Sequence, residues 1–176
     1  APSLAELSAP RRIAIATLEH AVGLGFKAGA MSGYVRRPIA KLARDNKGRL
    51  DPPVHRYDNY GMDSEYDYDP FWRACVELDL PISFHILTGP SGAVRGPKIN
   101  GFLTIVRSCQ DVMGAMVFGA VFERHPNLKV VCAEADAGWV PHYSYRMDHA
   151  YERHRNWMPH GELSKLPSEY FAENIY

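Results

Sequence analysis

Apolar and polar residues along the chain alternate between helical and strand-like spacing. Side chains that recur every three to four positions predict helices, and this spacing covers residues 11–25, 69–80, 102–124 and the segment from 140 onward. Short apolar runs, which are typical of buried strands, fall between them at residues 25–31, 82–87 and 125–135. Strands that alternate with helices of about ten or more residues favour parallel βαβ units, so the predicted fold class is α/β.

The segment before the apolar run at 82–87 divides into a loop and a helix. Residues 32–68 are polar and rich in tyrosine, and we interpret them as a long ordered loop. The helix begins at Asp69, a residue type that often caps helices, followed by a proline suited to the first turn. Its predicted buried side chains share helical spacing and are Phe71, Ala74, Cys75 and Leu78.

A histidine interrupts the strand at 82–87. Alternation places Ile82 and Phe84 on one face of this strand, and Ser83 and His85 on the other. The apolar face suits packing under helices, whereas a hydroxyl and an imidazole favour polar surroundings. In a closed barrel those surroundings are the interior near the carboxyl ends of the strands, where such enzymes build their sites. A core histidine bonded to a neighbour is the alternative that the sequence leaves open.

A carboxylate holds the corresponding place in the next strand. Val130, Cys132 and Glu134 share one face by alternation, and Glu134 lies at the carboxyl end. A buried carboxylate needs a cation beside it, which can be a metal ion or a nearby Arg or Lys. Imidazole and carboxylate are the usual ligands of catalytic zinc, and manganese also accepts them. His85 and Glu134 together therefore predict a divalent metal site at the mouth of a barrel.

Composition narrows the range of partners. The chain has 176 residues, 46% of them hydrophobic, and its twenty basic residues balance twenty acidic ones. This composition is typical of globular proteins. It lacks the excess of basic residues that would indicate nucleic acid or an anionic membrane as a partner. The longest apolar run, residues 112–122, is too short to span a bilayer. Three cysteines without a CxxC pattern favour a reducing, cytoplasmic setting.

Three stretches of this sequence carry a family resemblance: FWRACVELDLPISFHILTG, VFERHPNLKVVCAEADAGWVPHYSYRMDHAYE and LPSEYF. They resemble the amidohydrolase-related family, in the branch that contains metal-dependent hydrolases and the aminocarboxymuconate-semialdehyde and resorcylate-type decarboxylases. The resemblance covers residues 15–176. It implies a (β/α)8 TIM barrel with a divalent metal, zinc or manganese, at the carboxyl ends of the strands.

The resemblance also implies roles for the two residues singled out above. His85 matches the family's mid-chain metal-ligand histidine. Glu134 matches a position where many members have a catalytic or ligating histidine and a subgroup has glutamate. Whether Glu134 would bind the metal or transfer a proton stays open. Arg95 follows the His85 strand in a loop that would lie over the site in a barrel, and could bind a substrate carboxylate; an exposed loop charge is its alternative.

Two family features have no counterpart here. The first-strand H-x-H or E-x-H ligand pair does not occur near the start, and no strand supplies the last ligand, an aspartate. A full barrel takes about 250 residues. We therefore expect residues 1–176 to form a single domain that is an incomplete TIM barrel and contains only the middle part of that barrel.

The resemblance implies metal-assisted hydrolysis of a small carbonyl- or carboxylate-containing substrate. Two alternatives stay open, namely non-oxidative decarboxylation of an aromatic or unsaturated carboxylic acid and a non-catalytic barrel fragment or binding module. The expected partner is the small-molecule substrate. Dimers are common in the family, so a homodimer is compatible with the resemblance, although nothing in this sequence specifies one.

Overall fold

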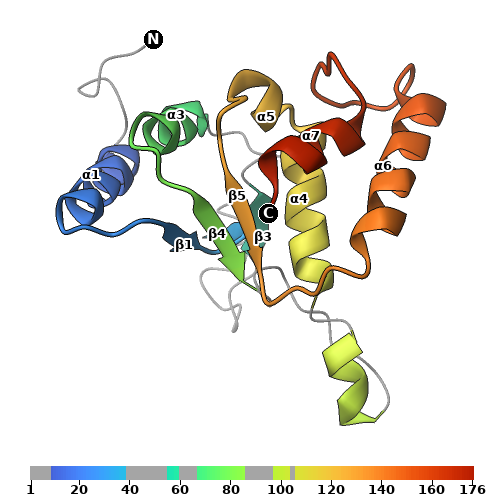
Figure 1. Cartoon of the computed structure of the whole chain (residues 1–176), viewed down its shortest axis with the longest axis horizontal. Helices are drawn as coiled ribbons and strands as arrows, with labels where there is room; N and C mark the ends of the chain where they lie inside the picture. The colour runs from blue at the N-terminus through green and yellow to red at the C-terminus, as the bar shows by residue number, and fades with distance from the viewer. Residues whose placement is uncertain (1–8, 39–54, 60–66, 86–96, 104–105) are drawn as a thin grey trace, which may run out of the picture.

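Three parallel strands form the centre of the structure (Figure 1). The computed structural model describes residues 9–38, 55–59, 67–85, 97–103 and 106–176. The strand order is β1 (Gly29–Met31), β4 (Ile82–His85) and β5 (Val130–Ala133). Ile175 then forms a parallel bridge with Val130. This arrangement confirms the parallel α/β architecture that the alternation of helices and strands predicts.

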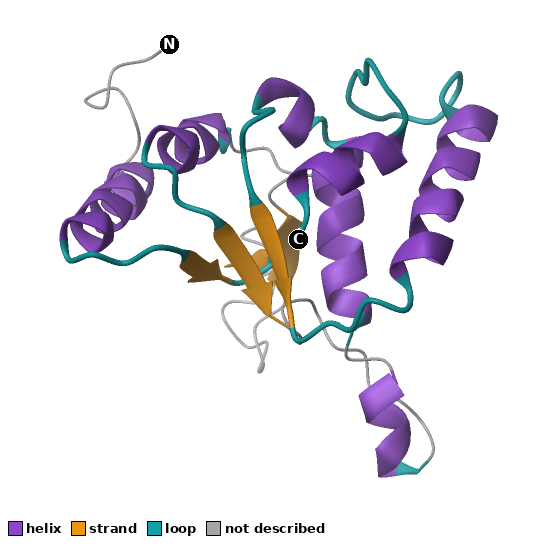
Figure 2. Ribbon diagram, in the orientation of Figure 1, coloured by secondary structure: helices purple, strands orange, loops and turns teal. Residues whose placement is uncertain are grey.

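Most of the helices lie beside this sheet in two groups (Figure 2). In chain order they are α1 (Ala9–Gly23), α3 (Asp69–Glu77), the 3-10 helix η2 (Lys98–Leu103), α4 (Arg107–Phe118), α5 (Val121–Arg124), α6 (Val140–His154) and α7 (Pro167–Asn174). Helices α1 and α3 contact each other on the β1 side, while α7 contacts α4, α5 and α6 (Figure 1). Within the described ranges, no helix has the length and apolar character needed to cross a membrane.

One face of the sheet builds the core. Ile82, Phe84 and Val130 are at most 1% exposed. They belong to one cluster that includes Trp72 of α3 and Met113 of α4. Burial of side chains this large is the main favourable term in folding. The helices are therefore held against the sheet by the alternate strand residues that the sequence predicts to be apolar.

The opposite face of the sheet is accessible among the described residues. Ser83 and His85 of β4 point to this face, and their neighbours in register are Ala30 of β1 and Ala133 of β5. All four are partly or fully exposed. The predicted alternation of β4 is thus confirmed for residues 82–85. In a closed barrel of this type, the face without helices is the interior.

Two expectations about the extent of the elements are wrong in detail. Residues 32–68 are not one loop, because β2 (Tyr34–Pro38) and β3 (His55–Asn59) pair as antiparallel strands. Their sequences, YVRRP and HRYDN, do not alternate between apolar and polar residues. The two strands are therefore identified by their backbone pairing and not by a hydrophobic pattern. The predicted helix at 102–124 is three elements, η2, α4 and α5. The break between α4 and α5 lies at Ala120, which adopts a left-handed backbone with φ of 55°. The hydrophobic pattern of the sequence gives no signal for such a change at a single residue.

The buried face of α3 also differs from the expected one. Trp72, Ala74 and Cys75 are buried, whereas Phe71 and Leu78 are only partly so. Asp69 is the first helical residue rather than the cap. Its carboxylate is engaged elsewhere: Arg124 donates from Nε to both oxygens, at 2.8 and 3.1 Å. The ion pair between α3 and α5 thus replaces the side-chain cap that the sequence suggests.

This ion pair makes stability depend on pH. Burial raises the pKa of Asp69, but hydrogen bonds and charge from Arg124 and His125 outweigh it and lower the pKa below the ordinary 3.8. The ionised carboxylate therefore stabilises the folded state above about pH 4, and this contribution is lost as the pH falls through the lowered folded pKa.

We expect Asp69→Asn to lower the free energy of unfolding by about 1 kcal/mol near pH 7, since the pair is partly solvent-exposed. Urea denaturation of both proteins at a series of pH values measures the difference. It should shrink toward zero below about pH 3. A difference that stays constant across this range would contradict the assignment. The control is Asp136→Asn, because Asp136 is exposed to solvent.

Gly161 packs closely against Ala120, where the helix is interrupted between α4 and α5. The Gly161 amide donates to the Phe118 carbonyl at 2.6 Å. A Cβ at position 161 would lie 2.6 Å from the Ala120 Cβ and 3.0 Å from its amide nitrogen. Because backbone would have to move, Gly161→Ala should destabilise the protein by about 1–3 kcal/mol. Thermal denaturation measures this, with Gly138→Ala, which meets no atom within 4 Å, as the control; equal melting temperatures for the two variants would refute the close approach.

Candidate metal site at the carboxyl ends of the strands

The structure brings His85 and Glu134 together. His85 is the last residue of β4, and Glu134 directly follows β5, the adjacent parallel strand. The imidazole Nε2 lies 3.0 Å from Glu134 Oε2. The two side chains are 59% and 67% exposed, respectively. The carboxyl ends of parallel strands meet at one edge of the sheet, and this geometry places both groups there.

Glu134 reaches His85 by leaving the face that alternation predicts for it. Cys132 is in register with Phe84 and packs against the same core, so the face shared by Val130 and Cys132 is the helix-covered one. The expectation that Glu134 shares this face is wrong. Glu134 has a φ of 55°, a left-handed conformation that ends the alternation. The turn carries its carboxylate across to the accessible face, beside His85.

The donor set and its spacing fit a divalent metal. One imidazole nitrogen and one carboxylate oxygen are the donors that zinc and manganese accept. The His85–Glu134 separation of 3.0 Å is that of a hydrogen-bonded ion pair. It is also about the distance between neighbouring donors, about 90° apart, on an octahedral ion such as manganese. Among the described residues, no group of three or more His, Cys, Asp or Glu side chains gathers to hold a metal. The described part of the chain therefore offers two donors, and Arg95, the predicted substrate ligand, lies outside the described residues.

Two cysteines lie behind this pair, on the core side of the sheet. The thiol of Cys109 in α4 lies 3.8 Å from the Phe84 carbonyl oxygen, one residue before His85. A hydrogen bond with Cys132 lowers the pKa of the Cys109 thiol, and the same contact together with burial raises the pKa of Cys132. The sequence offered no signal for this contact, because it joins a helix to a strand 23 positions away.

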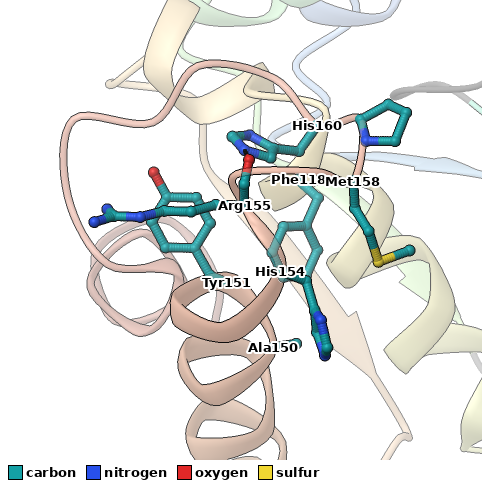
Figure 3. A pocket seen from close by; sticks show the side chains of 8 residues that line it. Phe118, Ala150, Tyr151, His154, Arg155, Met158 and His160 are labelled. Carbon is teal, nitrogen blue, oxygen red and sulfur yellow. Dashed lines mark hydrogen bonds between the residues drawn. The ribbon is translucent and has the colours of Figure 1, made fainter.

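A pocket of about 250 Å³ lies elsewhere, beside the last turn of α6 (Figure 3). Its walls are mostly apolar, and its lining residues are Phe118, Ala150, Tyr151, His154, Arg155, Met158, Pro159 and His160. The Arg155 guanidinium lies 5.3 Å from the centre of the Tyr151 ring. None of the described residues that line it carries a carboxylate, and the fifteen residues of α6 separate it from the segment that carries Glu134. The cavity is therefore not part of the His85–Glu134 site.

Solved structures share this fold. The 2,6-dihydroxybenzoate decarboxylase from Rhizobium superposes with a TM-score of 0.62 at 19% identity, over 94% of this chain and 47% of its own. A dihydroxybenzoic acid decarboxylase from Polaromonas, with bound manganese and the inhibitor 2-nitroresorcinol, gives 0.55 at 20% identity, over 94% and 46%. The 5-carboxyvanillate decarboxylase from Novosphingobium aromaticivorans, with bound manganese, gives 0.62 at 17% identity, over 93% and 42%.

The chain spans about half the length of these structures. At these identities the likeness establishes the fold alone: the parallel βα units are part of a TIM barrel, as predicted. The family model described as Amidohydrolase matches residues 5–171, which is nearly the whole chain and includes both His85 and Glu134. This protein therefore belongs to the amidohydrolase family.

Proposed function

We propose that this chain supplies part of the divalent-metal site of an enzyme that acts on a small carboxylate- or carbonyl-containing substrate. In this proposal His85 is a metal ligand. The observation that carries it is the 3.0 Å approach of His85 Nε2 to Glu134 Oε2 at the carboxyl ends of two adjacent parallel strands. An exposed pair of this kind contributes only about 0–1 kcal/mol to folding, so a role in stability is a weak explanation for it.

The metal would be manganese or zinc. Manganese is favoured because two of the structures that share the fold carry it. When bound, such an ion polarises a substrate oxygen and neutralises negative charge on the substrate. Glu134, which follows the strand next to His85, either completes the coordination or holds a proton at its carboxylate for transfer to the substrate. Arg95, in the segment after β4, would bind a substrate carboxylate.

Within this proposal, we favour non-oxidative decarboxylation of an aromatic carboxylic acid. Support comes from three decarboxylases of hydroxylated benzoates among the structures with this fold. Metal-assisted hydrolysis is the second candidate, supported by the family description itself. The two reactions differ in what Glu134 must do: a decarboxylase needs a proton delivered to a ring carbon, whereas a hydrolase needs a base for a water molecule.

The test is an assay of the protein loaded with manganese. We expect release of carbon dioxide from 2,6-dihydroxybenzoate that disappears after treatment with a chelator and returns with added manganese. Release of product from an aryl ester or lactone, without carbon dioxide release, would support the hydrolase instead. A protein that binds neither manganese nor zinc and catalyses neither reaction would refute both, and would favour the non-catalytic binding module.

A further inference from the structure

The cavity beside α6 lies between the last turn of that helix, the loop that follows it and the end of α4 (Figure 3). Its volume is about 250 Å³, and an apolar cavity of about 150 Å³ is large enough to bind benzene. Helix α6 has fifteen residues and is therefore about 22 Å long. The cavity lies at the opposite end of α6 from the segment that carries Glu134 (Figure 1).

Backbone hydrogen bonds hold the loop after α6 in place. The amides of Trp157 and Met158 donate to the His154 carbonyl oxygen at 3.0 and 2.9 Å, which turns the chain back at the end of the helix. The Gly161 amide donates to the Phe118 carbonyl oxygen at 2.6 Å and so fixes the far end of the loop to α4. The cavity is therefore built into the fold, as most small-molecule sites are.

Rings and a thioether form much of the cavity wall. Phe118, Tyr151 and His160 contribute rings, and the exposed Met158 contributes its thioether. The His160 and Tyr151 rings already pack edge to face, with centroids 5.3 Å apart. Aromatic side chains prefer offset or edge-to-face contact with another ring, and a methionine sulfur is attracted to a ring edge. This wall therefore favours a flat aromatic molecule over a flexible aliphatic one.

The polar groups of the wall are mostly engaged within the chain. The Tyr151 hydroxyl donates to the Leu163 carbonyl oxygen at 3.3 Å, and the two His160 ring nitrogens lie against the carbonyl oxygens of Arg155 and Gly161. Arg155 itself is exposed, with its guanidinium beside the Tyr151 ring (Figure 3). Among the described lining residues, Arg155 alone carries a permanent charge, so a charged group on a ligand should be an anion such as a carboxylate.

We propose that this cavity binds a small aromatic carboxylate, with its ring in the apolar interior and its carboxylate at the mouth beside Arg155. An apolar interior by itself would accept any hydrocarbon of suitable size. The rings of the wall and the single cation narrow the class to an aromatic anion. The cavity shares no residue with the His85–Glu134 pair, so this inference does not depend on the proposed function.

The experiment is a titration of the isotope-labelled protein with benzoate, in the presence of zinc, followed by the NMR signals of the backbone amides. We expect saturable shifts at Ala150, Tyr151 and Met158, which lie along the cavity. Hexanoate, which keeps the carboxylate without the ring, and benzyl alcohol, which keeps the ring without the charge, should each bind about 5-fold more weakly. Absence of saturable shifts at the cavity, or shifts only next to His85 and Glu134, would overturn the proposal. Equal affinity for hexanoate would overturn the aromatic class.

Three variants assign the two ends of the ligand. Arg155→Gln should weaken benzoate binding about 5-fold and leave benzyl alcohol unchanged, because only the carboxylate loses its partner. Arg146→Gln is the matched control, since Arg146 is an exposed arginine of the same helix that is not among the lining residues. His85→Ala should bind benzoate at the cavity as the unsubstituted protein does, so a failure of the metal site leaves this result unchanged. Equal benzoate affinity in Arg155→Gln and Arg146→Gln would overturn the role of Arg155.

Discussion

His85→Ala should abolish stoichiometric binding of manganese by this protein. The imidazole is one of two donors that meet at the carboxyl edge of the sheet, and alanine supplies no replacement. Changes that only orient a ligand already cost about 10–100-fold in metal affinity, so loss of a direct ligand should cost more than about 100-fold. Isothermal titration of the metal-free protein with manganese, together with elemental analysis of the purified protein, measures the effect.

Ser83→Ala is the matched control for this change. Ser83 lies on the same strand and the same face, two residues earlier, and should bind manganese as the unsubstituted protein does. Glu134→Gln then separates the two roles left open for Glu134. If Glu134 is a ligand, Glu134→Gln should lower the affinity for manganese, as His85→Ala does. If Glu134 transfers a proton, the metal should stay bound in Glu134→Gln while turnover is lost. Unchanged metal binding in His85→Ala would remove His85 from the site.

Trp72→Ala should destabilise the fold by about 3–5 kcal/mol. Trp72 is completely buried and connects α3 to the core cluster formed by the sheet and α4. Its removal leaves a cavity that neighbouring side chains can fill only in part. For a domain with a total stability of about 5–15 kcal/mol, this is a large share. Urea denaturation monitored by far-UV circular dichroism measures the change. The comparison of free energies requires that the two proteins have the same m-value.

Trp157→Ala provides the comparison within the same chain. Trp157 is 69% exposed, and surface substitutions usually change stability by less than about 0.5 kcal/mol. Both variants remove one indole, so they differ chiefly in burial. A similar loss of stability in the two would mean that α3 does not pack on the sheet as described.

Much of the fold could be predicted from spacing alone. Alternation in residues 82–85 identified the core face through Ile82 and Phe84 and the accessible face through Ser83 and His85, because side chains in a strand point to opposite faces at every step. Alternating helices and strands led to a parallel sheet, since parallel strands need a crossover connection. These are local rules, and they hold for β4 and β5 with their flanking helices. The prediction of one domain over residues 1–176 stays a prediction.

The candidate site was predicted only in part. Its two residues were found because a polar group at the end of an apolar strand is unusual, and the same rule applied to His85 and Glu134. The expectation that Glu134 shares a face with Val130 and Cys132 was wrong, since period-two alternation continues only while the backbone stays extended. Similarly, helical spacing placed Trp72 off the buried stripe of α3, because side-chain size and the shape of the facing sheet select which positions are covered.

The sequence by itself determined the alternation of helices and parallel strands around β4 and β5 and the position of His85 near a strand end. Only the tertiary structure decided that Glu134 turns over to meet His85, that Ala120 breaks the long apolar helix, and that Cys109 and Cys132 come together. The physical reason is the range of the interactions. Periodicity reports which side of an element is apolar, whereas single left-handed residues and contacts between distant elements arise from packing of the whole chain.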